Sequence, residues 1–406
     1  MNACPILRRL LDAALLAVDG RALVAGHLRA QVQTFGGIVA IGKAASAMLQ
    51  GALEVLPAVP ALLVTKDGHV LPALQDRPGV EIIEAGHPLP DARSLHAGRR
   101  SLDFIAAAPV ERPLLFLLSG GASSLVEVLP QGVTLGDWQG ANAWLLGGGL
   151  DIHAINALRK RLSCIKGGRL LTHLGGRRAV VLMISDVPGD DPTSIGSGVL
   201  SPCAERPLPD NLSHPLRALL DLAPPQPALG DARWEAVESH ILAGNATALD
   251  GAVRAACCLG WPIYRAHELL SGDAAETGVR LARELIDGAP GVYLWGGETT
   301  VTLPPNPGRG GRNQHLALSA ALALEGQAGI TLLAAGTDGT DGVTQDAGAC
   351  VDGRTAALMR ARGIDPEASL LNADSGSALA AVDALIRSGP TGTNVMDVVL
   401  AIKMLA

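Results

Sequence analysis

The run Leu114-Leu115-Phe116-Leu117-Leu118 leads directly into Ser119-Gly120-Gly121-Ala122-Ser123, a turn of small residues. An apolar run without polar alternation predicts a strand that is buried on both faces, and the glycines predict a tight turn into a helix. Similar runs recur at residues 37–41, 61–65, 179–185, 292–295, 331–335 and 398–402. Longer helical patterns lie between them, so the sequence predicts an α/β fold with a mainly parallel sheet covered by helices.

The composition limits the kind of protein. The chain has 406 residues, is 48% apolar and 17% charged, and has a net charge of −7. This length predicts two domains, because single cores stop growing near ~250 to 300 residues. The longest apolar runs, about eight residues, are far shorter than the ~20 of a membrane helix, so we expect a soluble protein. An acidic chain with few aromatic residues also lacks the surfaces of a nucleic-acid-binding protein.

Prolines and cysteines add two further expectations. Prolines gather between Cys203 and Ala228, which reads as a connection, and we expect domains at residues 1–230 and 231–406. The six cysteines show no C-x-x-C spacing and no nearby histidine pair. This pattern indicates neither a zinc site nor a disulfide framework, and it suits a reducing cytoplasm.

The ends of the first strands carry candidate anion-binding residues. In open parallel sheets, ligands bind beyond the carboxyl ends of the strands. Gly42-Lys43 follows the first strand, and a lysine at a helix N-terminus opposes the helix dipole unless an anion lies there. Ser119, Gly120, Gly121 and Ser123 offer hydroxyl and backbone N–H groups for phosphate or carboxylate oxygens. A solvent-facing lysine and an ordinary tight turn are the alternatives.

A cationic segment follows at residues 156–169. On a helix, Arg159, Ser163 and Lys166 are spaced i, i+4 and i+7, so they share one face, and Gly167-Gly168 ends the helix. We expect Arg159 and Lys166 to bind an anion. A solvated charged surface is the alternative.

Carboxylates gather after the strand at 179–185. Asp186, Asp190 and Asp191 lie within six residues and repel one another, and a hard divalent cation bound with water and phosphate compensates such a cluster. Mg²⁺ is the natural candidate. Asp-Pro and Pro-Gly pairs also form ordinary turns, and this alternative is strongest for Asp191.

The glycine-rich basic turn Gly308-Arg309-Gly310-Gly311-Arg312-Asn313-Gln314 precedes an apolar helical run in the second half of the chain. Glycines let backbone N–H groups approach a ligand, and the helix N-terminus adds partial positive charge, so the turn suits an anion. We expect Arg312 and Asn313 to contact it. An exposed loop with solubilising arginines is the alternative.

Two more loops follow buried strands in this half. Gly297-Glu298 repeats the combination of a strand and glycines, and Asp338 and Asp341 alternate with glycines and threonines. Such loops can bend around an oxygen-rich ligand or a metal. Plain turns remain the alternative for both.

Together these motifs resemble the class II glycerate kinases, also called glycerate 2-kinases or the MOFRL family, in order and over nearly the whole chain. The motifs stand at residues 42–43, 119–123, 165–169, 185–190, 296–301, 310–314, 337–342 and 389–394. The resemblance implies a Rossmann-like N-terminal domain and a smaller α/β C-terminal domain whose MOFRL region spans about residues 290–400. It places the active site in the interdomain cleft, where ATP, Mg²⁺ and D-glycerate give 2-phosphoglycerate and ADP.

The resemblance also implies roles for single residues. Lys43 and Arg312 match the proposed catalytic cations of the family, and we expect Asp186 and Asp190 to hold Mg²⁺ or to orient the hydroxyl group. The expected partners are a small-molecule substrate and a nucleotide, and a homodimer is left open. Departures from the family pattern at residues 197–199, 341–344 and 373–376 concern loop shape and substrate fit.

An NAD(P)H-dependent hydroxypyruvate reductase is the alternative function, because members of this family have often carried that label. Such an enzyme needs G-x-G-x-x-G after its first strand, followed about 20 residues later by an acidic residue. Residues 37–42 do not have this spacing. The sequence therefore favours the kinase.

Overall fold

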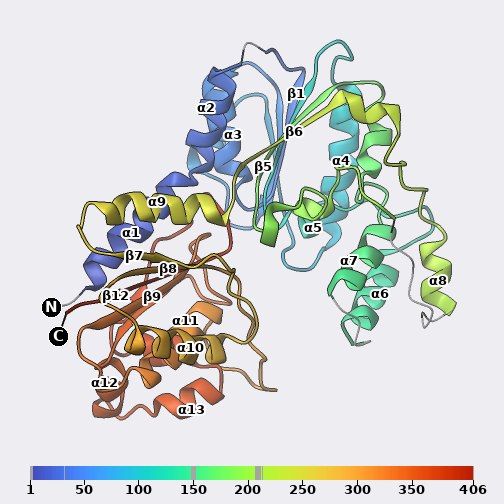
Figure 1. Cartoon of the computed structure of the whole chain (residues 1–406). Helices are drawn as coiled ribbons and strands as arrows, with labels where there is room; N and C mark the ends of the chain where they lie inside the picture. The colour runs from blue at the N-terminus through green and yellow to red at the C-terminus, as the bar shows by residue number, and fades with distance from the viewer. Residues whose placement is uncertain (1–2, 32, 148–151, 206–211, 213, 406) are drawn as a thin grey trace. The chain divides into compact units, whose positions relative to one another are not determined.

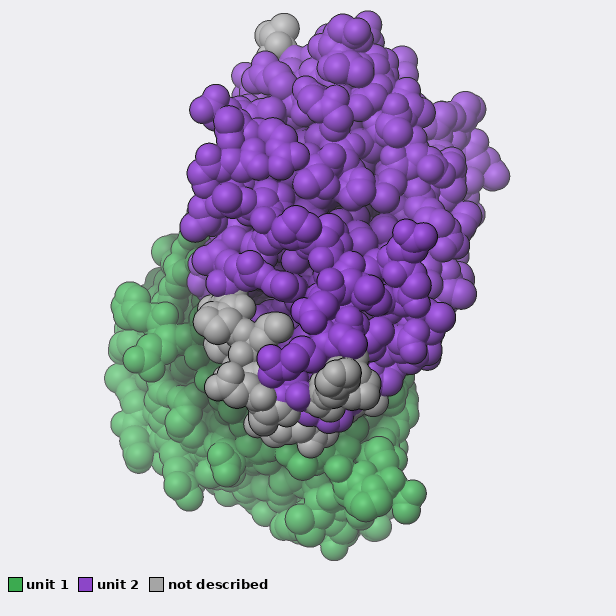
Figure 2. Space-filling model, turned by 90° about the vertical axis from the view of Figure 1, so that its right-hand side faces the viewer, with its two compact units in different colours: residues 1–19, 243–406 green, residues 20–242 purple. Residues whose placement is uncertain are grey.

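A computed structural model describes residues 3–31, 33–147, 152–205, 212 and 214–405 (Figure 1). The chain forms two compact units, which Figure 2 distinguishes by colour. Unit 2 consists of residues 20–242, and unit 1 consists of residues 1–19 together with 243–406. None of the described helices is both long and apolar enough to span a bilayer.

Unit 2 is built on a sheet with the strand order β3-β2-β1-β4-β5-β6. The pairs from β3 to β5 are parallel, as the sequence predicts. The strands are β1 Gly37–Ile41, β2 Ala61–Lys66, β3 Val80–Ala85, β4 Leu114–Leu118, β5 Ala179–Ile184 and β6 Val237–Ala243. The helices are α2 Gly20–Arg29, α3 Ala45–Val55, α4 Ala92–Ala107, α5 Ala122–Leu125, α6 Leu135–Gly147, α7 Ile152–Arg161 and α8 His214–Leu220. Short 3-10 turns are η1 Pro72–Leu74, η2 Arg169–His173, η3 Pro188–Asp190, η4 Ile195–Ser197 and η5 Ala232–Ala236.

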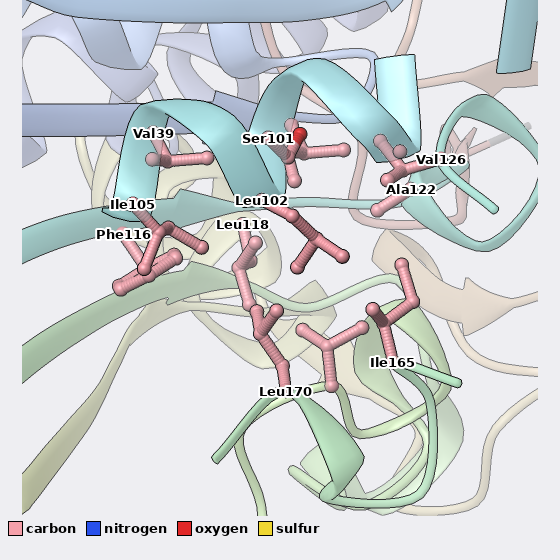
Figure 3. A pocket seen from close by; sticks show the side chains of 13 residues that line it. Val39, Ser101, Leu102, Ile105, Phe116, Leu118, Ala122, Val126, Ile165 and Leu170 are labelled. Carbon is pink, nitrogen blue, oxygen red and sulfur yellow. The ribbon is translucent and has the colours of Figure 1, made fainter. Parts of the chain in front are cut away.

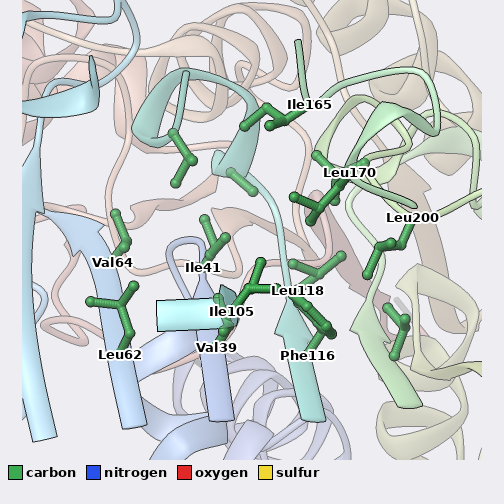
Figure 4. Packing of buried hydrophobic residues seen from close by; sticks show 14 of the residues in the cluster. Val39, Ile41, Leu62, Val64, Ile105, Phe116, Leu118, Ile165, Leu170 and Leu200 are labelled. Carbon is green, nitrogen blue, oxygen red and sulfur yellow. The ribbon is translucent and has the colours of Figure 1, made fainter. Parts of the chain in front are cut away.

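Alternate residues of these strands pack into one apolar core. Val39, Leu62 and Phe116 point to the same face of the sheet, where Ile105 of α4 lies among them (Figure 4). All four side chains are 0% exposed. Each therefore stabilises the fold by roughly 1.5 to 3 kcal/mol through burial of apolar surface. Residues of the opposite face, such as Leu63, are equally buried. Burial on both faces explains why these runs lack polar alternation.

A small apolar cavity remains between α4 and the sheet. It has a volume of about 10 Å³, and its lining includes Val39, Phe116 and Leu118 (Figure 3). This is near the lower limit of ~10 to 15 Å³ for one water molecule, and apolar cavities of this kind stay dry. It is therefore a gap in packing and not a ligand site.

Unit 1 contains a mixed sheet with the strand order β11-β10-β9-β12-β8-β7. The pair β7–β8 is parallel, and the other pairs are antiparallel. The strands are β7 Ile263–Arg265, β8 Gly291–Gly297, β9 Ile330–Gly336, β10 Gly348–Asp352, β11 Leu385–Ile386 and β12 Asp397–Lys403. The helices are α1 Cys4–Ala17, α9 Asn245–Cys257, α10 Ala274–Asp287, α11 Arg312–Ala323, α12 Thr355–Ala361, α13 Pro366–Leu371 and α14 Ser375–Ala380.

The prediction of a mainly parallel sheet is wrong for unit 1. Helices cover both faces of this sheet, with α10 and α11 on one face and α1 and α9 on the other (Figure 1). Its central strands are therefore buried on both faces and read as continuous apolar runs. A continuous apolar run indicates that a strand is buried on both faces, but it does not indicate whether the strand is parallel or antiparallel to its neighbours.

The division into units also differs from the expected domains at 1–230 and 231–406. Strand β6 is the last strand of the unit 2 sheet, which moves the boundary to residues 242 and 243. Helix α1 packs on α9 in unit 1, and a side chain at Gly251 would place its Cβ atom 2.5 Å from the Cβ atom of Ala17. The first 19 residues consequently belong to unit 1.

One disulfide corrects the expectation from the cysteines. Cys4 of α1 and Cys350 of β10 are bonded, and their Cα atoms are 6.2 Å apart. They are separated by 346 positions in the sequence, so no spacing motif could reveal the pair. Cys164, Cys203 and the neighbouring Cys257 and Cys258 are not disulfide-bonded.

Candidate functional site

The turns after β1 and β4 are hydrogen-bonded to each other. The backbone N–H of Lys43 donates to the carbonyl oxygen of Gly120 at 2.8 Å, and the N–H of Ala44 donates to Oγ of Ser119 at 3.0 Å. Ser119 is fully buried, so its hydroxyl serves the first turn of α3. The Ser119 side chain thus has a structural role, and its predicted contact with a ligand stays a prediction.

Gly121 is the point where two side chains approach the backbone. Its φ is +84°, in the left-handed region that favours glycine. A Cβ atom at this position would lie 3.2 Å from Cγ of Lys43 and 3.2 Å from Nε2 of His87. The turn thus places the predicted lysine beside a histidine that the sequence analysis did not single out.

A polar cavity of about 180 Å³ lies beside this turn, within unit 2. It brings together four of the predicted ligand-binding residues, Gly121, Ser123, Arg159 and Lys166. The hydroxyl groups of Ser123 and Ser197 are hydrogen-bonded at 2.7 Å. The wall also includes His87 and Asn142, which the sequence analysis did not single out.

Arg159 and Lys166 meet in this wall for a reason other than the predicted helix. Helix α7 ends at Arg161, so the expected shared helical face is wrong. The hydroxyl oxygen of Ser163 accepts hydrogen bonds from the N–H groups of Ile165 at 3.3 Å and Lys166 at 3.2 Å. This local side-chain turn competes with helical hydrogen bonding and returns the chain to the cavity.

Lys166 is neutralised within the protein. Its Nζ donates to Oε2 of Glu127 at 2.5 Å, and Oγ of Ser163 donates to Oε1 of the same carboxylate at 2.6 Å. Glu127 and Lys166 are each 1% exposed. Removing either partner of such a buried ion pair destabilises the fold, because it leaves an uncompensated charge in the interior.

The aspartates after β5 separate into two groups. Asp186 and Asp190 are half-buried, and Asp190 adopts a φ of +53°. Asp191 accepts hydrogen bonds from the N–H of Thr193 at 2.9 Å and from the hydroxyls of Thr193 and Ser194. Asp191 is therefore a turn-forming residue, which was the alternative explanation for it.

In unit 1, Arg312 is held by two carboxylates at one edge of the sheet. Its Nε and Nη2 donate to Asp397 at 2.6 and 3.0 Å, and its Nη1 pairs with Glu298 at 2.6 Å. Asp397 lies opposite Gly297 and Gly336 in the sheet, so β8, β9 and β12 position this group. Burial lowers the pKa of the Arg312 guanidinium, but the hydrogen bonds to Asp397 and the negative charges of Asp397, Glu298 and Asp341 together outweigh burial and raise this pKa.

Asp341 caps the helix that begins at Arg312. Its carboxylate accepts hydrogen bonds from the N–H groups of Asn313 at 3.1 Å and Gln314 at 2.8 Å. Burial raises the pKa of Asp341 to about 7. Asn313 and Asp341 are each 2% exposed and hold the turn, and their predicted contacts with a ligand stay predictions.

The remaining predicted residues of unit 1 also shape loops. Oδ1 of Asp338 accepts hydrogen bonds from the N–H and the hydroxyl of Thr340, each at 3.0 Å. Gly297 has a φ of +137°, and a side chain there would collide with the backbone of Leu270. Glu298 is the exception, since its side chain is 41% exposed and pairs with Arg312.

Four residues beside the predicted ones were missed, namely His87, Glu127, Asn142 and Asp397. A usable signal existed for two of them. Glu127 is a lone charge in an apolar stretch, and Asp397 immediately precedes the last predicted strand. No feature of the sequence distinguishes His87.

Comparisons with known proteins show which families and proteins this chain is similar to. Residues 6–208 match a family described as a domain of unknown function (DUF4147), and residues 291–397 match the MOFRL family. D-glycerate 2-kinase of Thermotoga maritima is 38% identical over 385 residues, covering 90% of this chain and 90% of that protein. A putative hydroxypyruvate reductase of Agrobacterium vitis is 37% identical over 422 residues, covering 98% and 94%. The crystal structure of a Thermotoga maritima glycerate kinase matches with a TM-score of 0.84 and 35% identity, covering 98% of each chain.

Proposed function

The chain belongs to the MOFRL family of glycerate 2-kinases, and from this premise we propose that it transfers the γ-phosphoryl group of ATP to the 2-hydroxyl of D-glycerate. The products are 2-phosphoglycerate and ADP. The family expected from the eight motifs and the two-domain α/β fold are both confirmed.

The position of Lys43 is the structural observation that supports this proposal. The residue follows a buried parallel strand and lies at the start of α3, beside the backbone of Gly120 and Gly121. Phosphoryl transfer requires positioning and neutralisation of the charge on the transferred oxygens. A lysine beside a glycine-rich turn and a helix N-terminus can supply both.

The transfer is a direct in-line displacement. The substrate hydroxyl oxygen forms a bond to the γ-phosphorus and releases its proton to the solvent. The bond from that phosphorus to the bridging oxygen breaks, and ADP leaves with the electron pair. We propose that Lys43 and Arg312 both act on the transferred group. Asp397 keeps Arg312 oriented, and the half-exposed Glu298 is the partner that phosphate oxygens would displace.

We propose that Asp186 and Asp190 hold a magnesium ion that is shared with the nucleotide. Mg²⁺ is usually bound by one or two carboxylates and completes its shell with water and phosphate oxygens. Within the described residues, no three His, Cys, Asp or Glu side chains gather as a metal site, and the donor set here is these two half-buried carboxylates. When bound, Mg²⁺ neutralises phosphate charge. Asp186 has the further proposed role of orienting the substrate hydroxyl.

An ATP-coupled assay with D-glycerate tests the proposal, and phosphorus NMR identifies the hydroxyl that is phosphorylated. We expect Lys43→Ala and Arg312→Ala each to lower kcat by roughly 10³ to 10⁵, the range of a cation that stabilises the transferred group. Arg99 is exposed on α4 away from the cavity wall, and Arg99→Ala is the matched control. If both variants keep activity within a few-fold of the control, the roles of these cations are wrong.

Hydroxypyruvate and NADH form the second arm of this experiment. We expect no steady oxidation of NADH, because the turn after β1 is Gly42-Lys43 and lacks the glycine spacing of a dinucleotide site. Sustained oxidation without phosphorylation of D-glycerate would favour the reductase instead.

A further inference from the structure

The polar cavity of unit 2 carries a charge that the proposed transfer does not use. Arg159 and Lys166 line it, whereas no Asp or Glu is among its described lining residues. The charge of Lys166 is matched by Glu127, 2.5 Å away. Arg159 therefore gives the wall a net positive charge.

Arg159 is half-buried, and a hydrogen bond from its Nε orients the guanidinium. Its Nε donates to Oδ1 of the buried Asn142 at 2.6 Å. In the part of the chain that the structure describes, no carboxylate lies within ion-pair distance of its guanidinium. Burial lowers the pKa of Arg159, and no neighbouring carboxylate reverses this effect. The two terminal nitrogens form the edge that binds a carboxylate through two parallel hydrogen bonds.

The same cavity is also lined by the turn that Lys43 approaches. Gly121 lines the cavity, and the Cβ position of Gly121 is 3.2 Å from Cγ of Lys43. A small molecule that fills this cavity and binds Arg159 through a carboxylate therefore also contacts the turn beside the proposed catalytic lysine. The volume of about 180 Å³ is smaller than the ~300 to 1,000 Å³ of sites for larger ligands, which favours a small acceptor over a nucleotide.

We infer that this cavity is the acceptor subsite and that Arg159 binds the carboxylate of the hydroxy acid, with Asn142 as the positioning residue for its guanidinium. The inference rests on the proposed kinase function and deepens it. It defines the substrate class as small hydroxy acids with a free carboxylate, and it excludes neutral polyols and amides of the same size.

Calorimetry with D-glycerate in the absence of ATP tests the subsite separately from turnover. We expect Arg159→Gln to weaken D-glycerate binding by roughly 10- to 100-fold, the effect of losing a hydrogen bond to a charged group. Its KM for ATP should stay within about threefold of wild type, because the nucleotide makes no contact with this residue in the proposed arrangement. Arg99→Gln, the exposed control on α4, should match wild type in both measurements.

Asn142→Asp is a nearly isosteric second variant. It places a carboxylate next to Arg159, which would pair with the guanidinium and compete with the substrate. We expect it to weaken D-glycerate binding in the same direction as Arg159→Gln. This variant decides the question if Arg159→Gln fails to fold, and thermal melting establishes which variants are native.

A neutral analogue completes the test. Wild type should prefer D-glycerate to glyceramide, and Arg159→Gln should lose most of that preference. Native Arg159→Gln or Asn142→Asp that binds D-glycerate as tightly as wild type would overturn the inference, even if the wild-type kinase is active. D-glycerate binding that depends on Arg159 without any phosphorylation would support the subsite and refute the proposed kinase function.

Discussion

Gly121→Ala tests whether the turn after β4 positions the proposed catalytic lysine. The substitution adds a Cβ atom 3.2 Å from Cγ of Lys43 and 3.2 Å from the imidazole of His87. Gly132 provides a matched control, because its φ of +89° is close to the +84° of Gly121. A Cβ atom at Gly132 would meet nothing within 4 Å. The two substitutions share the backbone penalty and differ in the contact.

Comparison of Gly121→Ala with Gly132→Ala sets the expected changes in melting temperature and kcat. Alanine in the left-handed region costs about 1 to 2 kcal/mol, so both variants should unfold at a temperature lower by roughly 2 to 8 °C. Relief of a 3.2 Å contact requires a shift of a few tenths of an ångström at Lys43 or His87. A displacement of 1 Å at a catalytic group can reduce the rate ~100-fold, so we expect kcat of Gly121→Ala to fall roughly 3- to 10-fold below that of Gly132→Ala.

The assay compares kcat and KM of both variants in the ATP-coupled reaction, and thermal melts measure their stability. Equal kcat values for the two variants, with similar melting temperatures, would refute the idea that Gly121 is needed for the position of Lys43. A fall in melting temperature for Gly121→Ala alone would show instead that the contact matters for folding.

Two further predictions concern buried carboxylates. Because the pKa of Asp341 is raised from 3.8 to about 7, its contribution to stability is present below pH 3.8 and is lost as the pH rises toward 7. Between pH 4.5 and 7.5, the melting temperature of Asp341→Asn should therefore fall less, or rise more, than that of wild type, and parallel curves would contradict this. Glu127→Gln leaves the ammonium of Lys166 buried and unpaired, which should lower the free energy of unfolding in urea by about 3 to 5 kcal/mol. Adding Lys166→Met should recover most of that loss, and a double variant as unstable as the single one would contradict the ion-pair explanation.

The strands that the sequence predicted are those that helices cover on both faces. All seven apolar runs are strands, and the run at 114–118 matches β4 at both ends. Strands β3 and β6 were missed because solvent reaches them, and residues such as Glu84 and Glu238 are exposed. Partial exposure replaces the continuous apolar run by a polar pattern, so no local signal remained.

The site shows the same limit at the level of single residues. The end of the strand at residues 37–41 predicted Lys43, and the glycine-rich turn before α11 predicted Arg312, because in both cases the glycines and the following helix are adjacent in the chain. Their partners are not adjacent, since Asp397 is 85 positions from Arg312 and Glu127 is 39 positions from Lys166. The sheet register brings Asp397 to Arg312, and the turn at Ser163 brings Lys166 to Glu127. The sequence therefore predicted the cations but not the carboxylates that neutralise them.

How strongly each cationic side chain can bind an anion depends on whether a carboxylate of the protein already neutralises its charge. Lys166 and Glu127 cancel each other in a buried pair, so Lys166 adds little field in the cavity that it lines. Arg312 is compensated by Asp397, which is buried, and by Glu298, which is half-exposed and can exchange with an incoming anion. Arg159 has no carboxylate partner within the described residues, and its partner Asn142 is neutral. An anionic substrate therefore gains most from Arg159, because its binding neutralises a charge that the folded chain leaves uncompensated.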